Sequence, residues 1–351
     1  MALLFSRFFV LCAVVACTIF SFTWLWLLSS QEFGEIVPLT PERFQTPNPF
    51  KQRLVVFGDS WSDNDTENLP GKVWTDWLCS MMDCRQDNLA QTTPSRPQGK
   101  YTGCVVDKTE LELWDQLSQT RLADFKTQLR DWLDAESQAT KGLSTAAIRR
   151  LQDHTVFVVA FEVWDIWSLA TKDPEQAAPS VERRIKTLLS QLDLLSARWG
   201  AAELKVILTQ AIDVTFLPAF GYTGARNKDT VRIVGLWNRR LRQAVRAWDR
   251  GSIYLFDTNT FLMDRIRDWQ LYAAGIEEDN GLGKNTDPGW ENVVDPCVES
   301  GDEVMMNEIH LGPSAHRLLA TEIHRGVEEI LLSPKLSPPS DERHSRRGSA
   351  A

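Results

Sequence analysis

Short apolar runs alternate with longer amphipathic stretches through most of this chain. Runs of four to seven residues rich in β-branched and aromatic side chains, bounded by glycine or polar residues, predict buried strands. These runs are Leu54–Phe57, Thr155–Phe161, Leu204–Leu208 and Ile253–Phe256, with a further short strand leading into Asn88. Thr155–Phe161 is apolar on both faces, which is typical of a central strand in a parallel sheet.

Between these runs, apolar residues recur at the three- and four-residue spacing that predicts helices. The segments are Lys72–Met82, one or two helices within Leu111–Glu136, Val181–Trp199, Val231–Trp248 and Ser314–Ile330. Strands that alternate with helices predict an α/β fold. We expect a doubly wound, flavodoxin-like, mainly parallel sheet of about five strands with helices on both faces. Residues 91–109 and 262–300 lack a clear period, so we expect loops there that shape a pocket.

The hydropathy of the two ends predicts five segments: a cytosolic N-terminus (1–7), a transmembrane signal anchor (8–28), a stalk (29–52), the globular domain (53–332) and a disordered tail (333–351). The uncharged anchor of about 21 residues is long enough to cross a ~30 Å hydrocarbon core. A cleaved secretory signal is the alternative. Both readings predict a luminal or extracellular domain, either on a single-pass type II membrane protein or secreted.

The formal net charge of −9 offers no broad basic surface for nucleic acid, so we expect no nucleic-acid partner. We also expect a monomer. Four cysteines outside the anchor would face an oxidising compartment, and an even number is compatible with two disulfides. They are Cys79, Cys84, Cys104 and Cys297. The simplest pairing joins Cys79 to Cys84 and Cys104 to Cys297, although sequence leaves the connectivity open. No histidine lies at ligand spacing from them, so we expect no metal. Asn64 begins the one glycosylation sequon.

Gly58-Asp59-Ser60 directly follows the first predicted strand. A serine at the carboxyl end of such a strand lies where open α/β sheets place ligands and nucleophiles. The first N–H groups of a following helix are free to stabilise negative charge. An ordinary helix cap is the competing interpretation. Among the histidines, His310 precedes the last predicted helix and is the best placed general base for Ser60.

Several motifs in this order resemble the SGNH (GDSL-type) hydrolase superfamily, and more narrowly the fungal membrane-anchored or secreted GDSL lipases and carbohydrate esterases. The resemblance covers about residues 53–330. Its residues are Phe57–Asp63, Gly71–Trp74, Asp87–Ala90, Phe161–Ile166, Ile212–Pro218 and Glu308–Leu311.

The resemblance implies that Ser60 attacks an ester carbonyl and that His310 acts as base and then as acid. It implies an oxyanion hole formed by Ser60, Ala90 and Trp164, with Asp59, Asp165 and Glu308 as supporting residues. The resemblance implies no cofactor.

Asn307 stands where the family has the aspartate that orients the histidine. An amide stabilises an imidazolium less well than a carboxylate does. A backbone carbonyl, Glu308 or Asp302 could take that role. Ala90 replaces a glycine of the second motif, and Glu162 replaces a glycine of the third. Trp164 stands in place of the family's asparagine.

Three functions stay open. The first is a serine esterase that hydrolyses O-acyl esters of a carbohydrate or a lipid. The second is a polysaccharide O-acyltransferase, which shares the acyl-serine but delivers the acyl group to a sugar hydroxyl. The third is a glycan-binding protein with impaired catalysis, which Asn307 and Glu162 suggest.

Overall fold

The structure is a computed structural model that describes residues 52–64, 72–93, 102–111, 123–201, 203–217, 220, 225–273 and 310–332. The chain divides into two compact units, Met1–Pro47 and Asn48–Ala351, and every described residue belongs to the second. The predicted anchor, most of the stalk and the tail therefore lie outside the described residues. Among the helices that are described, none has the length and hydropathy needed to cross a membrane.

A five-stranded, entirely parallel sheet forms the centre of the described unit, in the order β2-β1-β5-β6-β7. Its strands are β1 (Gln52–Gly58), β2 (Cys84–Asn88), β5 (Thr155–Ala160), β6 (Leu204–Thr209) and β7 (Gly251–Phe256). The predicted α/β doubly wound fold is confirmed, and the strand order is the flavodoxin-like one. Order reverses between β1 and β5, because the chain leaves β1 toward β2 and later returns to the other side of β1.

Apolar side chains fill both faces of the sheet, as the uninterrupted apolar runs predict. Every residue of β5 is buried, and Leu54–Phe57 of β1 are inaccessible to solvent. Phe57 stacks on Phe157 of the neighbouring strand, and Trp132 meets both rings edge-on. These aromatic contacts fix β1 and β5, the two strands whose carboxyl ends carry the predicted motifs.

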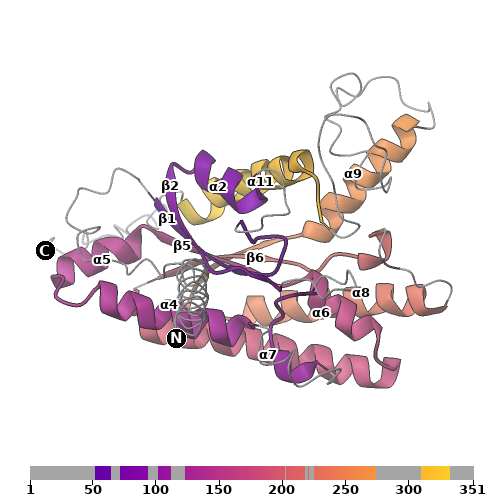
Figure 1. The fold of residues 1–351 in the computed structure, drawn as a ribbon, viewed down its shortest axis with the longest axis horizontal. Coiled ribbons are helices and arrows are strands. Elements are labelled where there is room, and N and C mark those ends of the chain that lie inside the picture. Colours follow the sequence, from indigo (N-terminus) through magenta and orange to yellow (C-terminus); the bar gives the residue numbers. More distant parts are fainter. Residues whose placement is uncertain are drawn as a thin grey trace, which may run out of the picture. The chain divides into compact units, whose positions relative to one another are not determined.

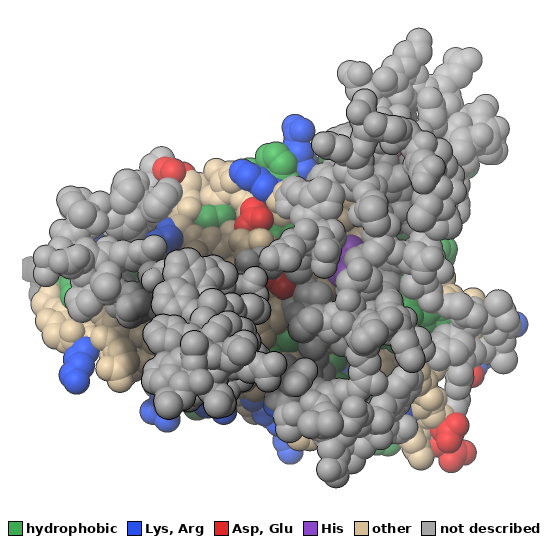
Figure 2. All heavy atoms as spheres, in the orientation of Figure 1, with side chains coloured by type: hydrophobic (Ala, Val, Ile, Leu, Met, Phe, Trp, Pro, Cys, Tyr) green, Lys and Arg blue, Asp and Glu red, His purple; other side chains and the backbone are tan. Residues whose placement is uncertain are grey.

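Helices cover both faces of the sheet (Figure 1). Helices α2 (Trp74–Met81) and α11 (Pro313–Val327) pack against each other on one face. Four helices pack with one another over the other face: α4 (Phe125–Ala139), α6 (Val163–Ala170), α7 (Pro174–Trp199) and α8 (Ala225–Ala247). A five-residue π-turn, Glu328–Leu332, continues α11. On the face shown in Figure 2, the basic and acidic side chains of the described residues are interspersed.

The structure corrects the sequence prediction in two loops. Residues 262–273, expected in a loop, belong to helix α9 (Thr258–Ala273). Asp257 caps the start of α9 by accepting a hydrogen bond from the Thr260 N–H at 3.0 Å. The segment expected as a loop over 91–109 holds a two-stranded antiparallel ribbon, β3 (Thr92–Thr93) with β4 (Thr102–Gly103), and a short 3-10 turn at Lys108–Glu110. Helix α5 (Thr145–Asp153) has no buried side chain, so it lacks the wide apolar stripe that would have revealed it.

A disulfide joins Cys79 of α2 to Cys84 at the start of β2. Cys104 is buried and has no disulfide partner among the described residues, and burial raises the pKa of its thiol to about 12. Cys297 lies outside the described residues, so the second pairing stays a prediction.

A buried ion network at the start of β1 ties the sheet to α4. The Arg53 guanidinium donates to Glu136 of α4 at 2.9 and 2.7 Å and to Asp87 of β2. Arg53 also lies over the Trp132 ring. Because the guanidinium and Glu136 are both buried, removing one partner would leave uncompensated charge in the interior.

We therefore expect Arg53→Met to lower the free energy of unfolding by about 3–5 kcal/mol. The matched control is Arg130→Met, which removes an exposed pair with Asp131 and should cost no more than about 1 kcal/mol. Denaturant unfolding of both variants measures the difference. Equal losses would contradict a structural role for the Arg53 network.

Candidate active site

The turn after β1 places Asp59 and Ser60 where the strand order reverses. The Asp59 N–H continues the ladder with β5 by donating to the Ala160 carbonyl at 3.1 Å. The Ser62 N–H then closes a tight turn onto the Asp59 carbonyl at 3.1 Å. In doubly wound sheets this reversal point, at the carboxyl ends of the strands, is where ligands bind. Ser60 therefore stands at the position that the fold favours for chemistry.

The side chain of Gln128, on α4, holds the last residue of β1. Its carboxamide accepts a hydrogen bond from the Gly58 N–H at 3.0 Å and donates to the Gly58 carbonyl at 2.9 Å. Asn238 of α8 makes the same pair of bonds with Ala211, just beyond β6, at 2.9 and 2.8 Å. Both amides satisfy backbone groups that have left the ladder, so each fixes the path of the chain at a strand's carboxyl end.

Asp59 connects the turn after β1 with the turn after β5. One carboxylate oxygen accepts from the Trp61 N–H at 3.0 Å, and the other accepts from the N–H groups of Glu162 and Val163, each at 3.3 Å. Burial raises the pKa of Asp59 to about 7, although the three N–H donors oppose that shift. Asp59 therefore joins the turn that carries Ser60 to the start of α6.

Trp164 bonds directly to the candidate nucleophile. Its indole Nε1 donates to Ser60 Oγ at 3.1 Å, and the Ser60 side chain is fully buried. Gly103 lies against the same indole: a Cβ placed there would overlap the ring and come within 3.1 Å of the Ser60 N. Only glycine fits between Trp164 and the Ser60 backbone. The indole N–H therefore stands at the serine, where the resemblance implies an asparagine amide.

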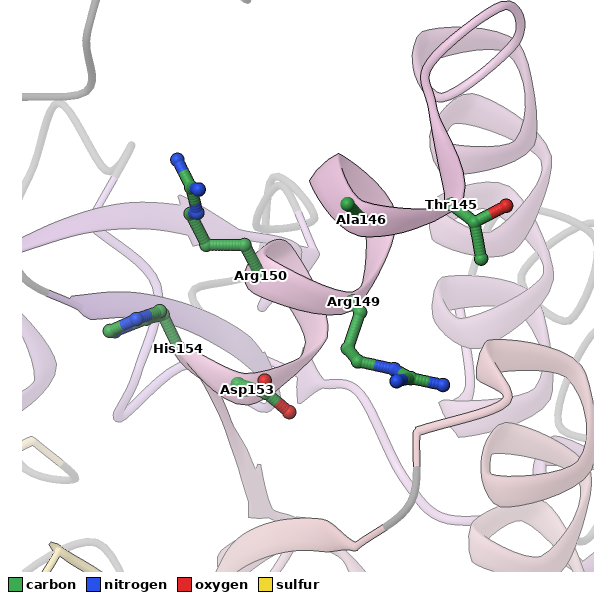
Figure 3. Close-up of a pocket in the computed structure, with 6 residues that line it drawn as sticks. All are labelled: Thr145, Ala146, Arg149, Arg150, Asp153 and His154. Atoms are coloured by element: carbon green, nitrogen blue, oxygen red, sulfur yellow. The ribbon is translucent and has the colours of Figure 1, made fainter.

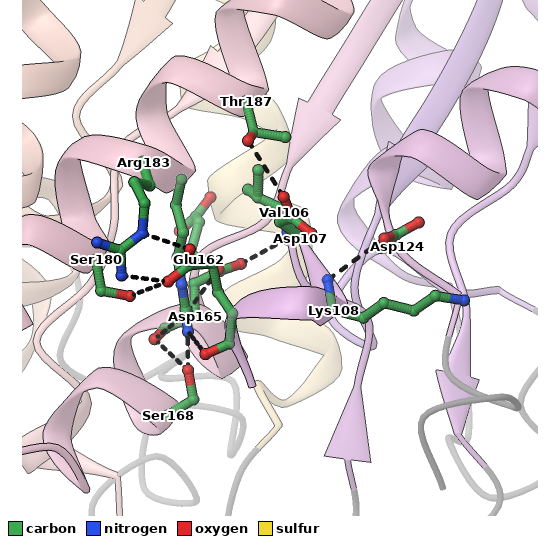
Figure 4. A network of polar contacts seen from close by, with 12 residues as sticks. Val106, Asp107, Lys108, Asp124, Glu162, Asp165, Ser168, Ser180, Arg183 and Thr187 are labelled. Atoms are coloured by element: carbon green, nitrogen blue, oxygen red, sulfur yellow. Dashed lines mark hydrogen bonds and ion pairs between the residues drawn. The ribbon is translucent and has the colours of Figure 1, made fainter. Parts of the chain in front are cut away.

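Asp165 connects α6 to its neighbours through a network of polar contacts (Figure 4). Its carboxylate accepts from the Val106 N–H at 2.8 Å and pairs with Arg184 of α7 at 2.8 Å. Arg184 also donates to Ser168 at 2.7 Å. Burial raises the pKa of Asp165 to about 6, against the opposing charge of Arg184. Asp165 holds the helix that carries Trp164.

Two hydrogen bonds connect the Ser60 turn, through α2, to α11, the helix that follows His310 in the chain. Trp74 of α2 donates its indole N–H to Ser62 Oγ at 3.1 Å, and its backbone N–H donates to His316 Nδ1 at 3.2 Å. His316 lies one turn into α11. Burial lowers the pKa of His310 to about 4, so its imidazole is neutral at pH 7 and able to accept a proton.

Other predicted residues are placed as follows. The Ala90 N–H, a predicted oxyanion donor, donates to Asn88 Oδ1 at 2.9 Å, so serving an oxyanion would require that bond to be exchanged. The Asn88 side chain also donates to the Ser62 carbonyl at 2.7 Å. Asn64, the sequon residue, is exposed and donates to Asp76 at 2.8 Å. Asn307 and Glu308 lie outside the described residues.

Sequence reasoning missed Gln128 and Gly103. Gln128 lies 70 positions from the glycine that it holds, on a helix whose predicted buried stripe was apolar. Gly103 lies in a stretch without a clear period. The one available signal was its glycine, which inside a strand indicates a close approach of another group.

A pocket away from the Ser60 turn lies on α5, and Figure 3 shows the residues that line it. Arg149 and Arg150 point away from each other there. His154, which lines this pocket, directly precedes β5, and its backbone carbonyl accepts a hydrogen bond from the Arg53 N–H at 2.8 Å. The pocket therefore lies at the amino ends of the strands, opposite the edge that carries Ser60. Its side chains do not converge on a ligand.

We predict that Gly103→Ala will displace the Trp164 indole and lower the free energy of unfolding by about 1–3 kcal/mol, as overpacking does. Gly235→Ala is the control: its new methyl would meet only the end of the flexible Arg239 side chain, within helix α8, where alanine is the better helix former. Thermal unfolding should show a loss for the first variant and no loss for the second. Equal behaviour of the two would contradict the close contact.

Comparisons with known proteins do not add to this geometry. No protein-family model matches the chain, and a search of curated proteins found no match. The functional interpretation therefore rests on the position of Ser60, the groups that surround it, and the motif resemblance.

Proposed function

We propose that this protein is a serine esterase of the SGNH (GDSL) type that hydrolyses O-acyl esters of a carbohydrate or a lipid. The observation that carries the proposal is the position of Ser60 at the reversal point between β1 and β5, with an indole N–H donated to its Oγ at 3.1 Å. Supporting it, α11 packs on α2 and brings the segment that begins at His310 to the same edge of the sheet.

In the proposed reaction, Ser60 Oγ attacks the ester carbonyl and its proton passes to His310. The carbonyl oxygen becomes an oxyanion, which preorganised N–H donors stabilise. The protonated His310 then gives its proton to the departing alcohol, which leaves an acyl-serine. Water, deprotonated by His310, releases the acid and restores Ser60.

The donors available near Ser60 are the backbone N–H of the turn and the Trp164 indole. In the resting structure the indole N–H points to Ser60 Oγ. As the oxygen attacks and becomes part of the ester, the same N–H is free to follow the developing negative charge. On this proposal, Trp164 contributes to the oxyanion hole in addition to packing on Trp167.

One observation favours the glycan-binding protein with impaired catalysis as the second candidate. The Ser60 side chain is fully buried, and the indole that bonds to its oxygen also covers it. An ester must displace that cover before attack. Glu162 beside Asp59 adds an acidic group where the family has glycine. If no substrate displaces the cover, the protein keeps the fold without the reaction.

The proposal predicts that purified protein hydrolyses p-nitrophenyl acetate or butyrate, and that Ser60→Ala and His310→Ala each lower kcat by about 10²–10⁴-fold. Both variants should retain the wild-type circular dichroism. Equal rates in the three proteins would remove both enzymatic functions. Adding an oligosaccharide acceptor and finding acylated sugar would instead select the O-acyltransferase.

Asn307→Asp tests the orienting group. A carboxylate should stabilise the His310 imidazolium that forms in the reaction, so we expect kcat to rise, with about 10⁴-fold as an upper limit. An unchanged kcat would mean that another group already orients the imidazole. Asn307→Ala serves as the control that removes the amide without adding charge.

The pH profile tests His310 as the base. Because burial lowers its pKa to about 4, the imidazole stays unprotonated well below the usual histidine range. We expect kcat/KM to be maintained as pH falls from 7 to 5 and to decrease through about pH 4. Circular dichroism at each pH shows whether the fold is retained. An acidic limb near the ordinary histidine pKa of about 6.5 would contradict this assignment.

A further inference from the structure

A small cavity lies beside the Ser60 turn, at the carboxyl edge of the sheet. Its lining includes Asp59, Ser62, Glu162, Thr209, Thr258 and Leu319. These residues come from the turn after β1, the N-cap of α6, the end of β6, the start of α9 and the middle of α11. The enclosed space has room for about one water molecule.

Two buried polar atoms of these lining residues have no hydrogen-bond partner among the described residues. They are Glu162 Oε2 and Thr258 Oγ1, and these two residues are 6 % and 1 % exposed. A buried polar group without a partner is costly, and native proteins commonly satisfy such groups with internal water. Both residues line one cavity that has space for a water, so a single molecule bonded to both would meet the need.

The charges around the cavity favour a neutral Glu162. Asp59 accepts three backbone N–H bonds, which favour its ionised form. Glu162 has the Thr209 hydroxyl as its hydrogen-bond partner, and burial raises its pKa well above the usual value, with the charge of Asp59 adding to that shift. Of the two neighbouring carboxyls, Glu162 is therefore the one that keeps a proton.

None of the described residues that line the cavity offers a cationic side chain to Glu162. On α6, Asp165 is acidic and its charge is matched by Arg184. On α11, burial lowers the pKa of His316 to about 3, so it is neutral at pH 7, and its Nδ1 accepts from α2. On α2, Asp76 accepts from Asn64. Before α9, Asp257 caps the helix.

We propose that this cavity is an internal water site in which Glu162 is held as the neutral carboxylic acid at neutral pH, with one water bridging Glu162 Oε2 and Thr258 Oγ1. The site links the start of α6, which carries Trp164, to the start of α9. Ionising Glu162 would place a second negative charge beside Asp59, in the turn that carries Ser60.

The pH dependence of the free energy of unfolding, compared between the wild type and Glu162→Gln, tests whether Glu162 is protonated. The amide has the shape of the neutral acid but does not titrate. Because folding raises the pKa of Glu162, the wild type loses stability relative to the variant as pH rises from about 4.3 toward the folded pKa. We expect the ratio of the two unfolding constants to change by about tenfold per pH unit in that range. Loss of the repulsion on Asp59 in the variant acts in the same direction.

Glu136→Gln is the matched control, because Glu136 is equally buried but faces Arg53. It should lower stability and should not show the Glu162→Gln trend. Parallel stability–pH curves for wild type and Glu162→Gln would overturn the proposal. So would a wild type that is stabilised by sodium or potassium, at constant ionic strength with choline as replacement, when Glu162→Gln is not, because Glu162 would then be an ionised cation ligand.

A crystal structure of the wild-type protein tests the water without any variant. We expect one water within hydrogen-bond distance of both Glu162 Oε2 and Thr258 Oγ1. Thr258→Val, which keeps the side-chain shape, should lose that water or shift it. An empty cavity in the wild type, at a resolution where other internal waters are seen, would overturn the proposal even if Glu162→Gln failed to fold.

Discussion

The candidate site depends on the Asp59 carboxylate, which joins two turns that are more than a hundred residues apart in sequence. By accepting N–H groups from Trp61, Glu162 and Val163, it fixes the Ser60 turn to the start of α6. The indole of Trp164 can meet Ser60 only because that start is fixed. Gln128 secures the same turn from α4, so the serine is positioned from two sides. A parallel sheet alone would bring the carboxyl ends of the strands together but would not fix the position of Ser60 relative to Trp164.

Much of the fold could be predicted from sequence because buried parallel strands leave a plain signature. β1 and β5 contain continuous apolar runs, Lys205 alone interrupts the apolar run of β6, and α7 and α11 follow their apolar stripes. Helix α5 has no buried face, and the start of α9 depends on an aspartate cap, so neither produces a strong periodic signal. Within the site, motif order suggested Ser60 and Trp164 as neighbours. The contacts of Gln128 and Gly103 could not be predicted, since each depends on packing between distant segments.

Three buried carboxyl groups illustrate how position decides the state of an acid. Glu136 faces Arg53, and Asp165 faces Arg184, and both pairs join a helix to its neighbours. Glu162 has a hydroxyl and a second acid beside it instead. In the described part of the chain, the two paired acids serve architecture, whereas the acid without a cationic partner lies next to the candidate nucleophile. A buried acid whose pKa is raised and that has no cationic partner among the described residues is typical of functional sites.

The contact between Gly103 and Trp164 also constrains how this protein can evolve. Any side chain at position 103 requires the indole to move, and loss of the indole removes the two closest contacts that exclude a side chain there. The two positions should therefore change together in descendants of this sequence, so that a small residue at 164 accompanies a larger one at 103. The residues at positions 103 and 164 in each lineage would therefore indicate whether the N–H donor to Ser60 was retained or lost.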